Sequence, residues 1–176
     1  MDHPMKWLAI AFSSCLVSPA IAQSELKPPL APLGFLVGNW KSDDGKVPET
    51  GGTSKGGSLV SVQSDGWALL RQDHTELFDK DGKPAGGFHQ TMVIYPDSGA
   101  IHADYVDGEG HAIHYATAEV MPGKSVTFSS APGQGPIFRL RYELLAPQTL
   151  AVSFGMTPPG QAEFHAIASG TMRKIE

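Results

Sequence analysis

The chain has a single cysteine, Cys15, among its 176 residues, which excludes an internal disulfide and a metal site built from several thiolates. It has no apolar run of the about 20 residues that a membrane-spanning helix requires, so no membrane span is expected. Acidic residues outnumber basic ones, 18 to 13, and the net charge of −5 argues against binding to nucleic acid. The sequence also lacks a nucleophile elbow, a phosphate-binding loop, a dinucleotide fingerprint and a zincin motif, so no catalysis, cofactor or metal is expected.

The N-terminal residues have the layout of an export signal. Lys6 precedes an apolar run over residues 7–17, and residues 18–22 end in a small-x-small pattern. This layout predicts a signal peptide over residues 1–22, cleaved after Ala22, and therefore a periplasmic or secreted protein. Lipidation at Cys15 is the alternative, although the residues before it match a lipoprotein motif poorly.

The remainder of the chain predicts a proline-rich tether, residues 23–32, followed by one domain, residues 33–176. Apolar stretches in this domain are short, and glycine or proline closes each of them within about a dozen residues, as in strands joined by tight turns. We therefore expect an all-β domain, an antiparallel up-and-down meander that closes into a barrel of about 8 to 10 strands. An open sandwich is the alternative.

Alternation along the expected strands predicts which side chains point inward. Over residues 137–145, aromatic and aliphatic side chains alternate with charged ones, so the apolar set should face a core. A two- or four-residue turn at residues 107–110 would pair Tyr105 with Ala112 and place His114 inside a face made mainly of alanine. A second inward face, mostly of small residues, is expected from Phe164, Ala166, Ala168, Gly170 and Met172. These small residues predict a hollow interior, unless large side chains from opposite strands fill it.

The segment Leu36-Val37-Gly38-Asn39-Trp40, at the start of a meander of short strands, resembles the opening Gly-x-Trp strand of lipocalin-like barrels. In layout the chain is similar to exported bacterial lipocalin-like (calycin-type) β-barrel proteins. The resemblance implies binding of a small molecule, and a basic residue of the last strand, Arg173 or Lys174, covering Trp40. It also makes the glycine-rich residues 42–57 a candidate gate at the barrel mouth, or else an ordinary surface loop.

Several polar groups carry alternative interpretations. His102, Asp104 and His111 share a face under the expected register, which suggests either a two-histidine, one-carboxylate metal site or a solvated polar surface. In the strand around residues 67–78, either the set with Arg71 and Asp73 or the set with Gln72, His74 and Glu76 can point inward, and an inward Arg71 and Asp73 would pair structurally. A histidine near the C-terminal end, as in some lipocalin-like barrels that hold haem, is present as His165. Periodicity does not fix the direction of His74, His102, His111 or His165.

These observations favour a carrier of a small, mostly apolar molecule in the barrel interior. The predicted ligand-binding side chains are Trp67, Tyr105, His114, Tyr142 and Phe154. Three alternatives stay open: a filled barrel that presents loops such as residues 42–57 and 131–135 to a partner protein, a haem-binding barrel that uses His165, and a cofactor-independent hydrolase or isomerase.

Overall fold

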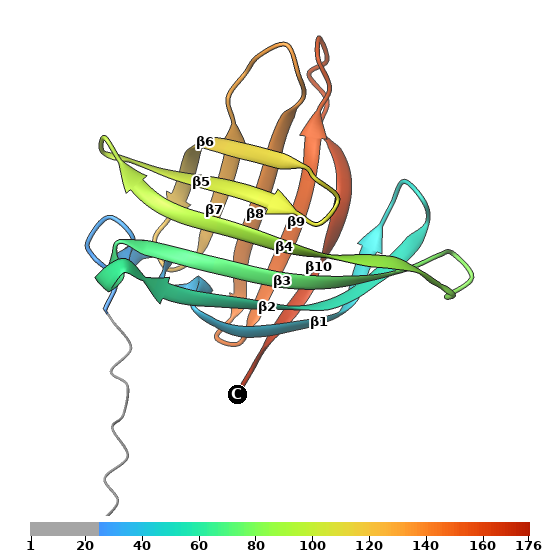
Figure 1. Cartoon of the computed structure of the whole chain (residues 1–176), viewed down its shortest axis with the longest axis horizontal. Helices are drawn as coiled ribbons and strands as arrows, with labels where there is room; N and C mark the ends of the chain where they lie inside the picture. The colour runs from blue at the N-terminus through green and yellow to red at the C-terminus, as the bar shows by residue number, and fades with distance from the viewer. Residues whose placement is uncertain (1–24) are drawn as a thin grey trace, which may run out of the picture.

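The computed structural model describes residues 25–176, and the predicted signal peptide lies outside these described residues. The regular secondary structure of the described chain is almost entirely strand (Figure 1). Its elements are η1 (Ala31–Leu36), β1 (Gly38–Val47), β2 (Gly52–Gln63), η2 (Ser64–Gly66), β3 (Ala68–Phe78), β4 (Pro84–Asp97), β5 (Ala100–Asp107), β6 (Ala112–Met121), β7 (Ser125–Ser130), β8 (Ile137–Ala146), β9 (Thr149–Thr157) and β10 (His165–Ile175).

The ten strands form one closed barrel in which every strand pairs with its neighbours in sequence and β10 returns to β1. Consecutive strands are antiparallel because a short connection reverses the chain between them. β10 is also antiparallel to β1, since ten strands of alternating direction leave the first and the last in opposite directions. The predicted all-β meander that closes into a barrel is therefore confirmed, and the open sandwich is not what forms. Among residues 25–176, no helix has the length and apolar character that a bilayer crossing demands.

The strand β8 shows how the sequence pattern sets the faces of the wall. Leu140 and Tyr142 are buried, whereas Arg139 and Arg141 between them are exposed. Because successive side chains of a strand point to opposite faces, the apolar set joins the core and the arginines meet water. The predicted orientation of this strand is thus confirmed.

One end of the barrel is packed solid. The 3-10 helix η1 lies across it, with Leu33 fully buried, and the backbone N–H of Gly123, in the β6–β7 turn, donates to Pro32 O over 3.0 Å. Leu30 is also fully buried, and Leu26 packs against the same cluster. The part of the predicted tether that the structure describes therefore packs on the barrel, because its leucines bury apolar surface there.

The opening Gly-x-Trp strand closes the same end. Trp40 is 1% exposed and its indole N–H donates to Leu36 O over 2.8 Å. Lys174, the second of the two expected basic residues, places Nζ 5.4 Å from the centre of the Trp40 ring and donates to Val37 O over 2.8 Å. Gly38 has φ +142°, and a Cβ there would collide with the Lys174 side chain, so only glycine fits.

The expected glycine-rich loop over residues 42–57 is not a loop. Most of it forms the paired ends of β1 and β2, joined by a turn at residues 48–51. The glycines here permit close approach of neighbouring backbones: a Cβ on Gly56 would collide with the carbonyl oxygen of His74 on β3. The glycine content was interpreted as the mark of a flexible loop, and this is wrong, because the glycines instead allow neighbouring strands to pack closely.

The β5–β6 register differs by one residue from the prediction. Tyr105 pairs with Ile113 and Asp104 with His114, because the turn holds three residues, 108–110, rather than two or four. The Asp107 side chain fixes this turn by accepting the backbone N–H groups of Glu109 and His111, each over 3.0 Å. An odd turn length exchanges the two faces of β6, so His114 points outward and Tyr115 fills the interior.

Candidate functional site

The barrel is hollow at the end opposite η1. Side chains such as Trp40, Met92 and Phe128 fill the η1 end, whereas the other end encloses a cavity of about 410 Å³. The apolar part of its wall consists of Leu77, Phe88, Leu140, Val152, Phe154, Ile167, Ala168 and Met172. The polar part consists mainly of Ser54, Ser58, Arg71, Asp73, Gln90, Tyr105, Asp107, Tyr115 and Tyr142. The predicted hollow interior is present, although alanines of β6 do not form it.

A buried ion pair from β3 lies in the cavity wall. Arg71 and Asp73 are two residues apart on one strand, so both point inward, with side chains 10% and 9% exposed. The Arg71 Nε and Nη2 groups both donate to Asp73 Oδ2, the first over 2.6 Å. Nη2 also donates to Gln90 Oε1 over 2.9 Å, and Nη1 lies 3.5 Å from the Met92 sulfur. The structure thus selects the inward Arg71 and Asp73 set, paired as predicted for that case.

The surroundings of Arg71 keep it charged. Burial by itself lowers the pKa of this guanidinium, but the Coulomb attraction and hydrogen bonds of Asp73 outweigh it and raise the pKa overall. The guanidinium carbon also lies 5.8 Å from the centre of the Tyr142 ring. Arg71 is therefore a permanent cation whose nitrogens are already engaged.

Two oxygens beside this pair have no partner among the described residues. They are Ser58 Oγ and Asp73 Oδ1, both buried. Ser58 on β2 pairs directly with Asp73 on β3, so the two side chains lie side by side on the inner face. Buried polar groups in folded proteins are nearly always hydrogen-bonded, so the Asp73 carboxylate oxygen lacks a donor here and the Ser58 hydroxyl, which can donate or accept, lacks a partner.

Three tyrosines complete the polar wall and stay neutral. Burial raises the pKa of Tyr142 and of Tyr115, in each case against the opposing effect of Arg71. Burial also raises the pKa of Tyr105, whose hydroxyl donates to Asp107 Oδ2 over 3.0 Å. The phenol groups are therefore hydrogen-bonding groups and not nucleophiles or bases near neutral pH.

An acidic group lies at the cavity mouth. Asp107, Glu109 and His111 each have a ligand-type atom within 4.8 Å of the others. Asp107 Oδ2 lies 3.0 Å from His111 Nδ1. Burial raises the pKa of Asp107, but the backbone and side-chain hydrogen bonds from His111, with those from Tyr105 and Glu109, lower it overall. Asp107 is occupied as the anchor of the β5–β6 turn, so these contacts explain the group without an ion.

The outer face of β4, β5 and β6 carries a different cluster from the one expected. Asp104 accepts a hydrogen bond from Tyr95 over 2.8 Å and lies 2.7 Å from His114 Nδ1. The His102 and His114 rings stack with centres 6.0 Å apart. His111, expected here, lies at the cavity mouth instead, because the three-residue turn displaces it. The polar surface interpretation fits better than a metal site, since the Asp104 and His114 side chains are 53% and 55% exposed.

The predicted ligand-binding side chains divide into two groups. Tyr105, Tyr142 and Phe154 line the cavity. The inward placement was wrong for His114, which the register turns outward, and for Trp67, which is 51% exposed next to the η2 turn at the packed end. Ser58 and Gln90 were missed. Their signal was weak in the sequence, because single polar residues within strands do not reveal which face they occupy.

The remaining histidine of interest lies outside the cavity. His165, at the start of β10, is exposed and its Nε2 lies 3.3 Å from Gln161 Oε1. A bulge after Ala166 then turns Ala168 inward. Phe164, also expected inward, lies on the outside against Arg139, 5.8 Å from its guanidinium. These placements argue against a haem held by His165 inside the barrel, and the cavity argues against a filled barrel.

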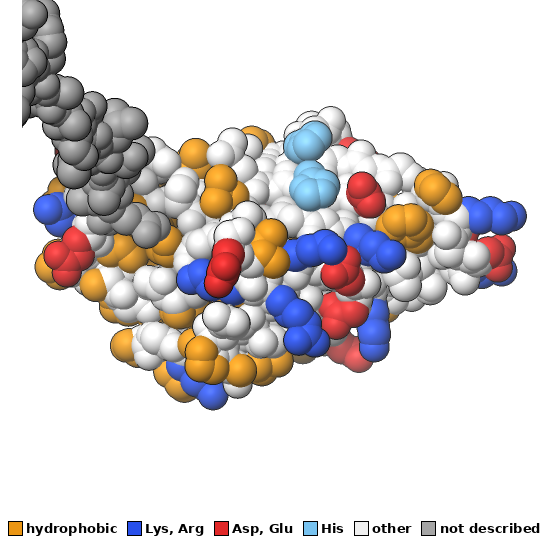
Figure 2. All heavy atoms as spheres, turned by 90° about the horizontal axis from the view of Figure 1, so that it is seen from below, with side chains coloured by type: hydrophobic (Ala, Val, Ile, Leu, Met, Phe, Trp, Pro, Cys, Tyr) orange, Lys and Arg blue, Asp and Glu red, His pale blue; other side chains and the backbone are white. Residues whose placement is uncertain are grey.

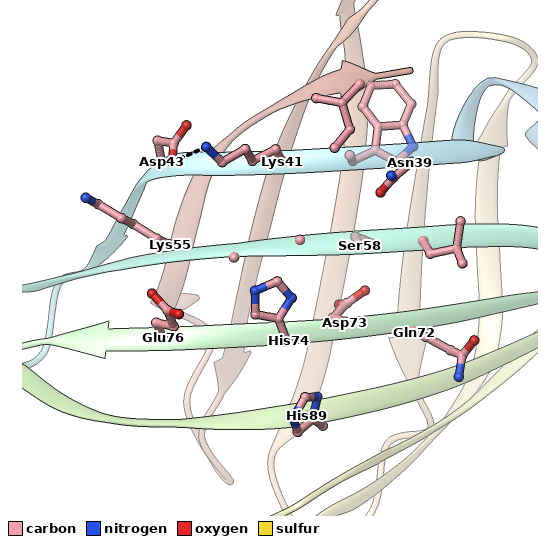
Figure 3. Close-up of a pocket in the computed structure, with 15 residues that line it drawn as sticks. Asn39, Lys41, Asp43, Lys55, Ser58, Gln72, Asp73, His74, Glu76 and His89 are labelled. Carbon is pink, nitrogen blue, oxygen red and sulfur yellow. Dashed lines mark ion pairs between the residues drawn. The ribbon is translucent and has the colours of Figure 1, made fainter.

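A groove of about 690 Å³ crosses the outside of β1 to β4 (Figure 3). Its floor is the bare backbone of Gly56 and Gly57, and His74 and His89 lie on one side, with ring centres 6.4 Å apart. Figure 2 shows histidines on this face with charged side chains of both signs next to them. Lys41 and Asp43 form one such pair, with 3.3 Å between the charged atoms. Because His74 lines this outer groove, its side chain points outward from the barrel.

Comparisons with known proteins relate the chain to others by fold. No protein-family model and no curated protein sequence matches it. The crystal structure of Rv2717c from M. tuberculosis is similar, with a TM-score of 0.58 and 15% identity over 86% of this chain and 99% of that one. The S-type phycobiliprotein lyase CPES from Guillardia theta has a TM-score of 0.47 and 8% identity over 81% of this chain and 89% of that one. The chain thus has a lipocalin-like β-barrel fold.

Proposed function

We propose that this protein binds a small, mostly apolar molecule in the interior cavity and acts outside the cytoplasm as an exported lipocalin-like carrier. The observation that carries the proposal is the hollow half of the barrel, about 410 Å³, which has both a continuous apolar wall and a few buried polar groups. Binding sites for small molecules have this composition, because apolar area supplies affinity and a few polar groups fix the orientation.

The cavity wall supports binding rather than catalysis. The inward ion pair of Arg71 and Asp73 is internally neutralised, and Tyr105 and Tyr142 stay protonated. A general base or nucleophile requires a group poised to exchange a proton near neutral pH, and the two tyrosine hydroxyls are not poised in that way. Their role in the proposal is to orient a bound molecule.

Fluorescence titration with the neutral dye N-phenyl-1-naphthylamine tests the binding proposal. Ala168 lines the cavity on β10, so Ala168→Phe should fill part of the hollow and weaken dye binding about tenfold or more. Ala166→Phe, on the exposed stretch of the same strand, is the matched control and should leave dye binding unchanged. Circular dichroism would establish that both variants keep the sheet.

Two results would overturn the binding proposal. One is the absence of saturable dye binding by the wild-type protein, and the other is equal binding by Ala168→Phe and the wild type. Native mass spectrometry of protein purified from its own host should additionally show a bound species that is released on denaturation.

The export part of the proposal rests on the N-terminal residue pattern. Protein recovered from the extracytoplasmic fraction of its host should begin at Gln23, which mass spectrometry of the intact chain would show. Protein that keeps Met1 and stays in the cytoplasmic fraction would contradict export without affecting the binding proposal.

A further inference from the structure

Two buried oxygens of the cavity wall, Ser58 Oγ and Asp73 Oδ1, indicate where a ligand would form hydrogen bonds. Ser58 is 4% exposed and the Asp73 side chain is 9% exposed, and both line the cavity. Neither Ser58 Oγ nor Asp73 Oδ1 has a hydrogen-bond partner within residues 25–176. A buried acceptor without a donor destabilises the protein, and a carboxylate oxygen does so more strongly than a neutral group. A neutral polar group placed between these strand neighbours would satisfy both, by donating to Asp73 Oδ1 and accepting from the Ser58 hydroxyl.

The cationic member of the ion pair is not free to bind an anion. Recognition of a carboxylate or phosphate by arginine uses two parallel N–H groups on one edge of the guanidinium. Nε and Nη2 of Arg71 already donate to Asp73, and Nη2 also donates to Gln90. The remaining nitrogen, Nη1, contacts the Met92 sulfur at 3.5 Å, so no edge of the guanidinium offers two free N–H groups, and an anion at Asp73 Oδ1 would be repelled by that carboxylate.

A second cation is also disfavoured. An ammonium group at Asp73 Oδ1 would lie close to the buried Arg71 guanidinium and be repelled by it. The other buried carboxylate of the wall, Asp107, already accepts hydrogen bonds from Tyr105, Glu109 and His111. A neutral donor binds Asp73 Oδ1 without this repulsion.

We infer that the ligand carries a neutral hydrogen-bond donor, a hydroxyl or an amide N–H, which binds between Ser58 Oγ and Asp73 Oδ1, while its apolar body lies against Leu140, Val152 and Phe154. This inference rests on the binding function proposed above and adds the class of ligand. The cavity selects alcohols and amides over carboxylates of the same shape.

A matched series of naphthalene derivatives tests the inference by displacement of bound N-phenyl-1-naphthylamine. The three probes are 2-naphthalenemethanol, 2-methylnaphthalene and 2-naphthoate, which share a ring system and differ in the head group. We expect the alcohol to bind about tenfold or more tightly than the methyl compound, because a hydrogen bond to a charged acceptor adds that much. The carboxylate should bind most weakly.

Two variants assign the preference to the acceptor pair. Ser58→Ala should reduce the advantage of the alcohol over the methyl compound, while Ser61→Ala, the same change on the outer face of the same strand, should not. Asp73→Asn removes the charge that occupies Arg71, so 2-naphthoate should now bind more tightly than the alcohol. If Asp73→Asn does not fold, the comparison of the two serine-to-alanine variants still decides the test.

The outcomes separate the two proposals. Displacement by none of the probes, with no dye binding, would overturn the binding function itself. Displacement by all three with equal affinity, unchanged in Ser58→Ala, would leave the binding function intact and overturn the inference. Tightest binding of 2-naphthoate to the wild-type protein would overturn it as well.

Discussion

Removal of Asp73 should test whether the ion pair inside the barrel is needed for stability. Asp73→Ala leaves the Arg71 guanidinium buried, at 10% exposure, with Gln90, the Met92 sulfur and the Tyr142 ring as its remaining partners. Loss of one partner from a buried pair typically costs about 3–5 kcal/mol. The adjoining cavity can admit water, so we expect the lower end, about 3 kcal/mol of the free energy of unfolding.

Urea denaturation followed by circular dichroism measures this cost. Arg71→Met combined with Asp73→Ala should come within about 1 kcal/mol of the wild type, because no uncompensated charge remains. Glu143→Ala is the control: it breaks the Arg141–Glu143 pair, which is 45% and 34% exposed, and should cost less than about 1 kcal/mol. A loss for Asp73→Ala no larger than that of Glu143→Ala, or a double variant less stable than Asp73→Ala, would refute the reasoning.

Two further predictions concern backbone conformation and pH. Gly38→Ala should lower the free energy of unfolding by about 1–3 kcal/mol, because φ is +142° and the new Cβ would collide with the Lys174 side chain. Gly133→Ala is the control and should be nearly neutral, since a Cβ there meets no neighbour. Equal melting temperatures for the two variants would contradict the prediction. Hydrogen bonds from His114, and then from Tyr95, lower the pKa of Asp104. The ionised Asp104 therefore stabilises the fold at pH values above its unfolded pKa of about 4, and this contribution is lost as the pH falls through its lower folded pKa. The difference in free energy of unfolding between the wild type and Asp104→Asn should therefore shrink on acidification. A difference that stays constant down to about pH 2 would contradict this prediction.

The architecture could be predicted from the sequence because the signals for it are local. Turn residues such as Ser98-Gly99 lie between apolar stretches, and the alternation around Leu140 and Tyr142 orients β8 without knowledge of its neighbours. The Gly38 and Trp40 pattern likewise predicted a basic residue of the last strand over the Trp40 ring, and of the two candidates, Arg173 and Lys174, it is Lys174 that makes this contact. Short turns leave antiparallel pairing as the only geometry, and an all-antiparallel meander of this length removes its edges by closing.

The glycine-rich segment shows a limit of composition. Glycine permits both flexible loops and close packing of strands, so residues 42–57 fit either state when read alone. Only the approach of the β3 backbone to Gly56 distinguishes the two. The burial of Leu30 could not be predicted from composition either, because a leucine in a proline-rich segment is buried only if the folded barrel end leaves space for it.

The sequence by itself determined the sheet, its meander order and the inward direction of Tyr105, Tyr142 and Phe154, because alternation with a period of two is written along each strand. The tertiary structure alone decided the composition of the cavity. One residue in the β5–β6 turn moved His114 from the inside to the outside and Tyr115 to the inside. Ser58 and Asp73 became neighbours only through the pairing of β2 with β3, since contact across strands depends on register, which single-strand patterns do not specify.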